Sequence, residues 1–219
     1  MKGVRIAAFP SSFRGPSKRA PRWSGVEMFP DLARDDVFRL ETARLWLRWP
    51  RAADAAAIDR YCSRWEVAQF TARIPHPYPA GSAERFIFAA REGNATGRDL
   101  TLVLTPLRDM REAIGAVSLE GRAQGRLTLG YAVAPEHWGK GFATEAVTAL
   151  VGIAFGALGF SEVWARVEPE NTASVKVLTK LGFEHVRTLP DEKNIPLDHY
   201  RLIRRSAPAT SPRAGRASK

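Results

Sequence analysis

The sequence predicts an α+β fold, in which a mixed and mostly antiparallel β-sheet is flanked by helices on both faces. Residues 100–105, 113–120 and 126–133 read as three short strands separated only by turn residues, which is typical of an antiparallel meander. A helix starts after Gly141 and leads to a β-branched and aromatic strand at 162–167, the parallel return of a βαβ unit. With 219 residues, of which 45% are apolar and 26% charged, the chain can form one globular core.

The part of the chain before the meander predicts one strand and two helices. Residues 40–49 alternate between inward and outward positions and predict the first strand. Helical spacing predicts helices at 54–62 and 82–91. Three prolines interrupt residues 74–79 and predict a loop between these helices, and the turn at 93–97 ends the second one.

The part after the meander predicts two helices and three strands. The helix after Gly141 has an apolar face at helical spacing, made of Ala143, Val147, Leu150, Val151, Ala154 and Leu158. A second helix is predicted from 171 to 181, with Gly182 as its left-handed cap. Residues 183–187 and 197–203 predict the last two strands. The predicted order along the chain is therefore β-α-α-β-β-β-α-β-α-β-β.

The net charge of +10 is of the size that nucleic-acid-binding proteins carry, but the basic residues gather at the two ends of the chain. Residues 1–27 contain six Lys/Arg and one acid, and residues 204–219 contain five Lys/Arg and no acid. Of the 33 basic and 23 acidic residues in all, 22 of each kind remain in residues 28–203. The central part is formally neutral, which argues against a specific nucleic-acid partner.

The composition also predicts the domain boundaries and the compartment. The Pro-, Ser-, Gly- and Arg-rich ends predict basic disordered segments at 1–37 and 206–219 around one domain at 38–205. Cys62 is the single cysteine, so it cannot form an internal disulfide, and no Cys/His cluster predicts a metal site. No apolar run reaches transmembrane length, and Pro10 cuts the apolar start too short for a secretory signal. We expect a cytoplasmic protein with no metal and no membrane partner.

The stretch VAPEHWGKGFATEA, residues 133–146, is the most informative feature of the sequence. It reads as the end of a strand, a glycine turn and the first turn of a helix. The first amides of a helix have no partner inside it, and the helix dipole places positive charge at the same end. Gly139 and Gly141 have no side chain, so a pyrophosphate can approach the backbone. Glu136 adds no attraction for such an anion, and Lys140 offsets it in part.

Other interpretations of these residues remain open from the sequence alone. A Walker A loop needs Gly-x4-Gly-Lys-Ser/Thr, which is absent. A dinucleotide-binding turn needs a small residue where Thr144 stands, and an antiparallel meander does not normally precede it. The two glycines alone also fit a tight strand-to-helix connection without a ligand. Asn171 and Ser174 share one helix face, and both are compatible with a simple role at the helix start.

The glycine turn and the segment PENTASVKVLTKLGF, residues 169–183, together resemble the acetyl-CoA-binding core of the GNAT N-acetyltransferases. The resemblance covers about residues 38–205 and is closest to the ribosomal-protein-alanine acetyltransferase (Rim) type, with matching segments at 40–45, 74–79 and 138–146. It implies the GNAT acyl-CoA N-acyltransferase fold and direct transfer of the acetyl group of acetyl-CoA to a primary amine. The implied acceptor is a protein N-terminus or a small-molecule amine, and the implied assembly a monomer or homodimer.

The resemblance also implies which residues bind acetyl-CoA. Backbone groups around Val133 would be free to pair with the pantetheine amides, because Pro135 lacks an N–H and ends the strand ladder. The amides of the glycine turn would hold the pyrophosphate, and Asn171 would contact the cofactor arm. The implied binding residues are Val133, Trp138, Gly139, Lys140, Gly141, Phe142, Ala143, Thr144 and Asn171.

Two residues are implied in the chemistry of transfer. Ser174 would donate a hydrogen bond or a proton to the departing thiolate. Glu120, at the end of a central strand, is the first candidate for the base that deprotonates the amine. Weaker candidates for the base are His137, His76 and Tyr131. An alternative function is that of an acyl-CoA-binding regulatory or partner-binding protein that has this fold but no turnover.

Overall fold

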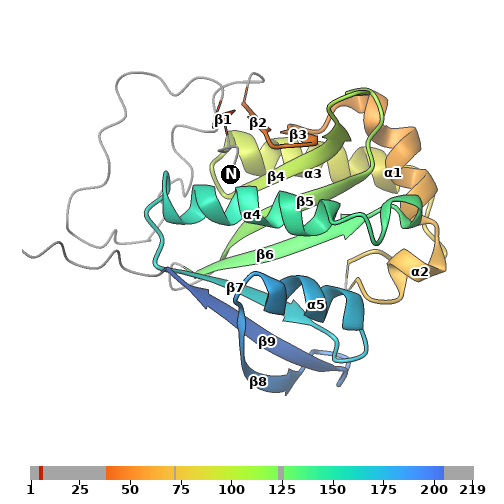
Figure 1. Ribbon diagram of the computed structural model, residues 1–219. Coiled ribbons are helices and arrows are strands. Elements are labelled where there is room, and N and C mark those ends of the chain that lie inside the picture. The colour runs from red at the N-terminus through yellow and green to blue at the C-terminus, as the bar shows by residue number, and fades with distance from the viewer. Residues whose placement is uncertain (1–4, 7–37, 72, 123–125, 205–219) are drawn as a thin grey trace, which may run out of the picture.

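The computed structural model describes residues 5–6, 38–71, 73–122 and 126–204 (Figure 1). The strands are β1 (Arg5–Ile6), β2 (Arg39–Glu41), β3 (Leu45–Arg48), β4 (Asp99–Pro106), β5 (Gly115–Arg122), β6 (Arg126–Val133), β7 (Glu162–Val167), β8 (Glu184–Pro190) and β9 (Pro196–Ile203). The helices are α1 (Ala55–Cys62), α2 (Trp65–Ala68), α3 (Ser82–Ala95), α4 (Phe142–Phe155) and α5 (Thr172–Lys180), with 3-10 turns η1 (Ala52–Asp54) and η3 (Pro135–His137).

All strands belong to one sheet in the order β1-β2-β3-β4-β5-β6-β7-β9-β8. Every neighbouring pair is antiparallel except β6 and β7, which pair in parallel only from Leu127↔Val163 to Leu129↔Ala165. Beyond these residues the two strands separate, and we call this opening the fork. The parallel return to the meander, the antiparallel remainder of the sheet and the mixed α+β class are therefore confirmed.

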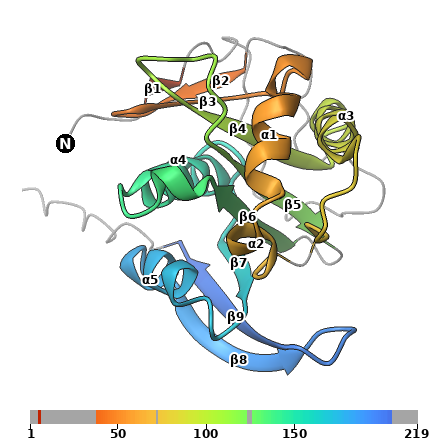
Figure 2. The ribbon, with the colours of Figure 1, turned by 90° about the vertical axis from the view of Figure 1, so that its right-hand side faces the viewer.

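Helices cover the two faces of the sheet in two groups (Figure 2). We call the face under α4 and α5 the α4 face and the opposite one the α3 face, because α1, α2 and α3 lie there. Leu127, Leu129, Val163 and Ala165 point to the α4 face, where they join the main core with residues of α4 and α5. A smaller core on the α3 face joins Ile58, Tyr61, Cys62, Val67, Ala83, Ile87 and Ala134, with Ala132 of β6 packed against it. Because side chains alternate along a strand, these two sets assign a face to every residue of β5, β6 and β7.

The predicted strand at 40–49 is wrong as a single element, because it is a hairpin of β2 and β3. Thr42 closes the turn: its backbone N–H donates to Leu45 O at 2.9 Å, and its Oγ1 accepts from Leu45 N at 3.0 Å. The alternation continues through the turn, so the pattern alone did not reveal it. The second predicted helix also runs further, to Ala95, and Asn94 near its end exchanges two hydrogen bonds with the Thr101 backbone.

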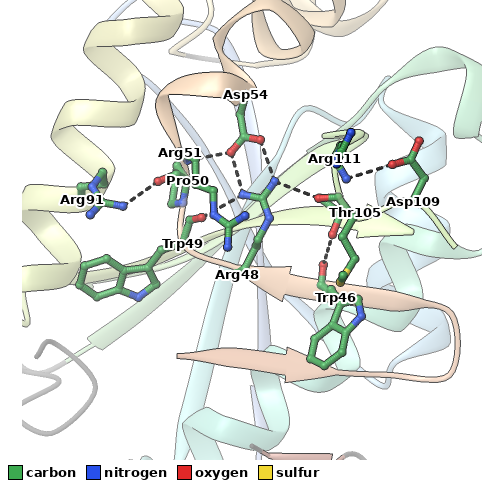
Figure 3. A network of polar contacts seen from close by, with 11 residues as sticks. Trp46, Arg48, Trp49, Pro50, Arg51, Asp54, Arg91, Thr105, Asp109 and Arg111 are labelled. Atoms are coloured by element: carbon green, nitrogen blue, oxygen red, sulfur yellow. Dashed lines mark hydrogen bonds and ion pairs between the residues drawn. The ribbon is translucent and has the colours of Figure 1, made fainter. Parts of the chain in front are cut away.

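A buried ion pair fixes the start of α1 to the end of β3 (Figure 3). Arg48 donates two hydrogen bonds to Asp54, at 2.8 and 2.7 Å, and the two residues are only 7% and 2% exposed. Arg48 also donates to the carbonyls of Trp49 and Met110, and the Arg51 amide donates to Asp54 at 2.7 Å. Each buried charge depends on the other, because neither can be solvated alone.

The predicted domain boundaries stay a prediction. Arg5–Ile6, inside the expected N-terminal extension, pairs with β2 as the short edge strand β1. The C-terminal segment at 206–219 lies outside the described residues. Within the ranges that the structure describes, no helix is long and apolar enough to cross a membrane.

Cys62 is expected to resist alkylation in the folded protein. It is 5% exposed on α1, and burial raises the pKa of its thiol to about 12, against a smaller opposing effect of a hydrogen bond with Tyr78. A thiol with that pKa is about one part in ten thousand thiolate at pH 8, whereas an ordinary cysteine is about one quarter thiolate. Iodoacetamide at pH 8, followed by intact-mass measurement, should therefore leave the native protein unmodified and label it in urea. Rapid native labelling would contradict the buried placement.

Candidate functional site

The connection between β6 and α4 adopts a backbone that only glycine accepts easily. It runs through η3 and residues 138–141 to the helix start at Phe142. Gly139 and Gly141 have φ angles of +70° and +79°, in the left-handed region. A Cβ built at Gly139 would meet no heavy atom within 4 Å, so the backbone there is open to an approaching group.

A run of backbone amides in this connection has no hydrogen-bond acceptor within the described residues. On one side Trp138 N donates to Pro135 O at 3.0 Å, and on the other Glu145 N donates to Gly141 O at 3.0 Å. The amides of residues 139–144 between them have no such bond. They lie at the N-terminus of α4, where the helix dipole also favours an anion. The donors therefore suit the pyrophosphate that the sequence predicted, and we call residues 138–144 the glycine turn.

Arg44 of the β2–β3 hairpin supports the glycine turn from outside. Its Nε donates to Glu145 Oε2 at 2.7 Å, its Nη1 donates to Lys140 O at 2.8 Å, and its guanidinium lies 4.7 Å from the centre of the Phe142 ring. Thr42 Oγ1 donates to the other oxygen of Glu145 at 2.6 Å. These contacts compensate the Glu145 carboxylate in the first turn of α4, where it would otherwise repel an anion. Sequence reasoning missed this role, since Arg44 served only to support the family resemblance.

The charge of Glu136 is balanced by Arg64, the residue before α2, rather than by its neighbour in the turn. Arg64 lies 3.0 Å from the Glu136 carboxylate and also 2.9 Å from Glu66. Lys140 was expected to offset Glu136, but its Nζ donates instead to the Glu136 backbone carbonyl at 2.7 Å. The Arg64–Glu136 pair thus links the helices of the α3 face to the glycine turn.

The Val133 carbonyl is not free, contrary to the expectation drawn from Pro135. Ala134 N donates to Ile114 O towards β5, so the polar backbone groups of Val133 point the other way, towards the fork. There the Val133 carbonyl accepts the indole N–H of Trp138 at 2.6 Å. Pro135 does end the ladder, but η3 turns the chain back and brings Trp138 onto the vacated carbonyl.

The start of α5 and one side chain of β6 meet at the fork on the α4 face. Asn171 Oδ1 accepts from Ser174 N at 3.1 Å, which is the N-cap role that the sequence left open. Tyr131 donates its hydroxyl to Ser174 O at 3.3 Å. Burial raises the pKa of Tyr131 to about 12, so its hydroxyl stays protonated and acts as a donor rather than as a base. The structure therefore brings together Ser174, Asn171 and Tyr131.

Glu120 lies near the fork on the opposite side of the sheet from Ser174. On β5 it alternates with Leu119 of the main core, so its side chain points to the α3 face, where it is 6% exposed. It is paired with Arg73 and accepts a hydrogen bond from Ser118 Oγ at 3.3 Å. A Cβ at Gly130 of β6 would come within 3.0 Å of Ser118 Oγ and 3.9 Å of Glu120 Oε1. Glycine at 130 therefore avoids a tight contact between a side chain and the Ser118 hydroxyl beside Glu120.

The two histidines named as weaker candidates for the base have other neighbours. His137 Nε2 lies 3.7 Å from a Glu112 carboxylate oxygen, and its ring lies beside Phe142. His76 packs edge-on against Trp65, with ring centres 5.3 Å apart. Among the described residues, no group of three or more His, Cys, Asp or Glu side chains could hold a metal ion.

Comparison with known proteins identifies this arrangement. A sequence profile of the acetyltransferase (GNAT) domain matches residues 44–184. The uncharacterized N-acetyltransferase p20 of Bacillus licheniformis is 32% identical over 154 residues, which cover 69% of this chain and 85% of that protein. The uncharacterized N-acetyltransferase YoaA of Bacillus subtilis is 42% identical over 152 residues, covering 66% and 82%. The solved structure of Mycobacterium smegmatis RimJ in complex with CoA-disulfide shares the fold, with a TM-score of 0.63, 23% identity and coverage of 73% and 81%.

Proposed function

Because this chain belongs to the GNAT acetyltransferase family, we propose that its glycine turn and fork are the sites of acetyl-CoA binding and of acetyl transfer. The chain is an acetyl-CoA-dependent N-acetyltransferase, with acetyl-CoA as co-substrate. The observation that carries the proposed site is the run of amides at 139–144, which has no acceptor among the described residues. We further propose a cytoplasmic location, a monomer or homodimer, and a peptide N-terminus or small-molecule amine as acceptor.

The residues present fit acetyl-CoA in the order predicted from the sequence. The amides of Gly139 to Thr144 would hold the pyrophosphate, whereas the Trp138 amide, expected to join them, already donates to Pro135 O. Val133 would offer its backbone groups towards the fork. Trp138 would then exchange the Val133 carbonyl for another partner. Asn171 would use its side-chain amide nitrogen towards the cofactor arm, because its oxygen caps α5. Acetyl-CoA supplies the thioester whose acetyl group is transferred.

Ser174 and Glu120 would act from the two sides of the sheet, with the fork between them. In the transfer, a C–N bond forms to the acceptor nitrogen and the C–S bond breaks. Glu120, on the α3 face, would take the proton that the amine loses, either directly or through water. Ser174, on the α4 face, would donate a hydrogen bond to the thiolate that leaves. Tyr131 would hold the first turn of α5 in place through the Ser174 carbonyl.

A thiol-release assay on the full chain tests this function. Acetyl-CoA is mixed with a panel of short peptides carrying free N-termini, amino sugars and polyamines, and free CoA is detected with a thiol reagent. The expected result is acceptor-dependent release of CoA with a matching gain of an acetyl group on one acceptor class by mass spectrometry. Tight binding of acetyl-CoA without transfer to any acceptor would instead favour a regulatory acyl-CoA-binding protein.

Replacing Gly141 by valine is expected to weaken acetyl-CoA binding by about tenfold to a hundredfold, the effect of losing one charge-assisted contact or more. A β-branched residue at φ +79° also costs about 1–2 kcal/mol of backbone strain. Gly81→Val provides the matched control, because Gly81 precedes α3 at φ +74° and its Cβ would meet an arginine nitrogen at the same 3.4 Å. Titration calorimetry should show lost affinity in Gly141→Val alone. Equal affinities in the two variants would refute the placement of the pyrophosphate.

Replacing Arg44 by alanine is expected to lower the affinity for acetyl-CoA about three- to tenfold, because Lys140 O and Glu145 lose their common donor. S-acetylpantetheine has no pyrophosphate, so its binding should not change. Arg39→Ala serves as control, since Arg39 belongs to the same hairpin and lies over Trp46 instead. Equal losses for both ligands, measured by calorimetry, would show that Arg44 supports the fold rather than the turn.

A further inference from the structure

Part of the α3 face carries no helix among the described residues. In Figure 2, α1 and α3 lie against the upper strands and α2 lies lower, at the level of β6 and β7, whereas β9 and β8 carry no helix on this side. Val163, Ala165 and Tyr200 point to the main core on the α4 face. Their neighbours Arg166 and His199 therefore point to the uncovered side.

Three basic side chains meet on this surface, one from each strand. Arg166 of β7 stands opposite His199 of β9, and His199 stands opposite Arg187 of β8. Residues directly opposite on antiparallel strands have Cβ atoms about 4.5–5.5 Å apart, so the three side chains are neighbours. Burial, and then the charges of Arg187 and Arg166, lower the pKa of His199. We call Arg166, Arg187 and His199 the basic cluster.

Neither arginine of the basic cluster has an ion-pair or hydrogen-bond partner within the described residues, and both are exposed. Three of the acids on these strands have other partners or positions. Asp198 points to the opposite face and accepts from Thr188 at 2.6 Å. Glu162 accepts from the Trp164 indole at 2.8 Å, and Glu184 stands opposite Arg201 at the far end of β8. Neither guanidinium of the cluster is therefore neutralised by a direct ion pair within the described residues.

The basic cluster borders the fork on the side where the acceptor would enter. Arg166 directly follows Ala165, the last residue of β7 that pairs with β6. Gly130, on the other arm of the fork, lies opposite Ser118 and close to Glu120 on this same face. An amine placed at Glu120 would thus have the guanidinium of Arg166 across the fork.

We propose that the basic cluster binds an oxyanion, carboxylate or phosphate, that the acceptor carries close to its amine; this rests on the acetyl-transfer function proposed above. Arginine guanidinium groups present forked donors that match both oxyanions. The same cluster repels acceptors that carry further positive charge, such as polyamines. The enzyme thereby selects anionic amines.

Paired acceptors test this selection in the full chain. The peptides Ala-Asp-Phe and Ala-Asn-Phe differ by one carboxylate, and Ala-phosphoSer-Phe and Ala-Ser-Phe differ by one phosphate. In each pair, kcat/KM from thiol release is expected to be at least about tenfold higher for the anionic peptide. This is the size of effect that one charge-assisted hydrogen bond provides. The two pairs show separately whether carboxylate or phosphate is preferred. Calorimetry with CoA-saturated protein repeats the comparison without turnover.

A double variant and its control locate the effect. Arg166→Gln with Arg187→Gln should abolish the preference for the anionic peptides and leave acetyl-CoA affinity unchanged. Arg39→Gln with Arg108→Gln removes the same charge from exposed positions elsewhere and should preserve the preference. The proposal is overturned if neither turnover nor binding distinguishes the pairs, or if only a single-stranded oligonucleotide binds in a cluster-dependent way. If no acceptor is acetylated but the anionic peptides still bind more tightly than their neutral partners, the transferase function is refuted, whereas the role of the basic cluster in binding anions stands.

Discussion

A Ser174→Ala variant is expected to lose about two to three powers of ten in kcat, while KM for acetyl-CoA changes little. The reason is that a donor aimed at the departing charge contributes mainly in the transition state, and removing one such donor usually costs that much. The start of α5 should survive the change, because Asn171 caps it through the Ser174 amide and not through the hydroxyl. Steady-state kinetics with varied acetyl-CoA measure both constants.

Thr172→Ala is the matched control for Ser174→Ala, since it removes a hydroxyl two residues earlier in the same helix. Its kcat should stay close to that of the parent. If the two variants behave alike, the Ser174 hydroxyl is only a helix-start residue. The leaving thiolate would then take its hydrogen bond from another group, and the protonated Tyr131 hydroxyl, which donates to the Ser174 carbonyl, is one candidate.

A Glu120→Gln variant is expected to lose about two to three powers of ten in kcat/KM for the amine, within the range that general bases contribute. A base acts only when it is deprotonated, so the parent should lose activity as the pH falls, and this acid limb should disappear in the variant. The change is nearly isosteric, and the Arg73 side chain that loses this ion pair is exposed enough to be solvated by water. A pH–rate profile of kcat/KM at saturating acetyl-CoA measures the effect.

Arg73→Gln separates the chemical role of Glu120 from a structural one. It removes the same ion pair from the other side, so it should retain most of the activity and the acid limb. If it matches Glu120→Gln in rate and profile, the ion pair rather than the carboxylate matters. A Glu120→Gln variant with an unchanged acid limb would show that the base is elsewhere or that the amine loses its proton to water.

Local sequence patterns were sufficient for most of the fold. The meander, the βαβ return and the helix at Asn171 follow from periodicity, turn residues and capping, which act between residues close in the chain. The hairpin turn at Thr42 was missed, because the alternation of apolar and polar residues continues through the turn and so gives no sign of it. The short helix α2 was missed for a related reason, since four residues are too few to show a period.

The candidate site could be predicted only where one segment contains it. The glycine turn is contiguous, so its left-handed glycines and unpaired amides follow from the sequence order. Arg44 reaches that turn from about a hundred residues away, and Arg64 reaches Glu136 from the connection between α1 and α2 on the other face. The basic cluster depends on strand register, which no local pattern fixes. The catalytic roles predicted for Ser174 and Glu120 stay predictions, and their position on opposite faces of the sheet follows only from the strand register.

The two separate apolar cores suggest how proteins built in this way diversify. The main core holds α4 and α5 with the strands that position the glycine turn, whereas the smaller core packs α1, α2 and α3 mostly among themselves. If the acceptor enters at the fork as proposed, substitutions in the loops around the smaller core would change its surroundings, provided that the Arg64–Glu136 pair, which joins these helices to the residues before the glycine turn, is kept. The fold can then keep acetyl-CoA as its donor while the acceptor substrate changes. A library of variants confined to residues 55–95 is the place to select for a new amine acceptor.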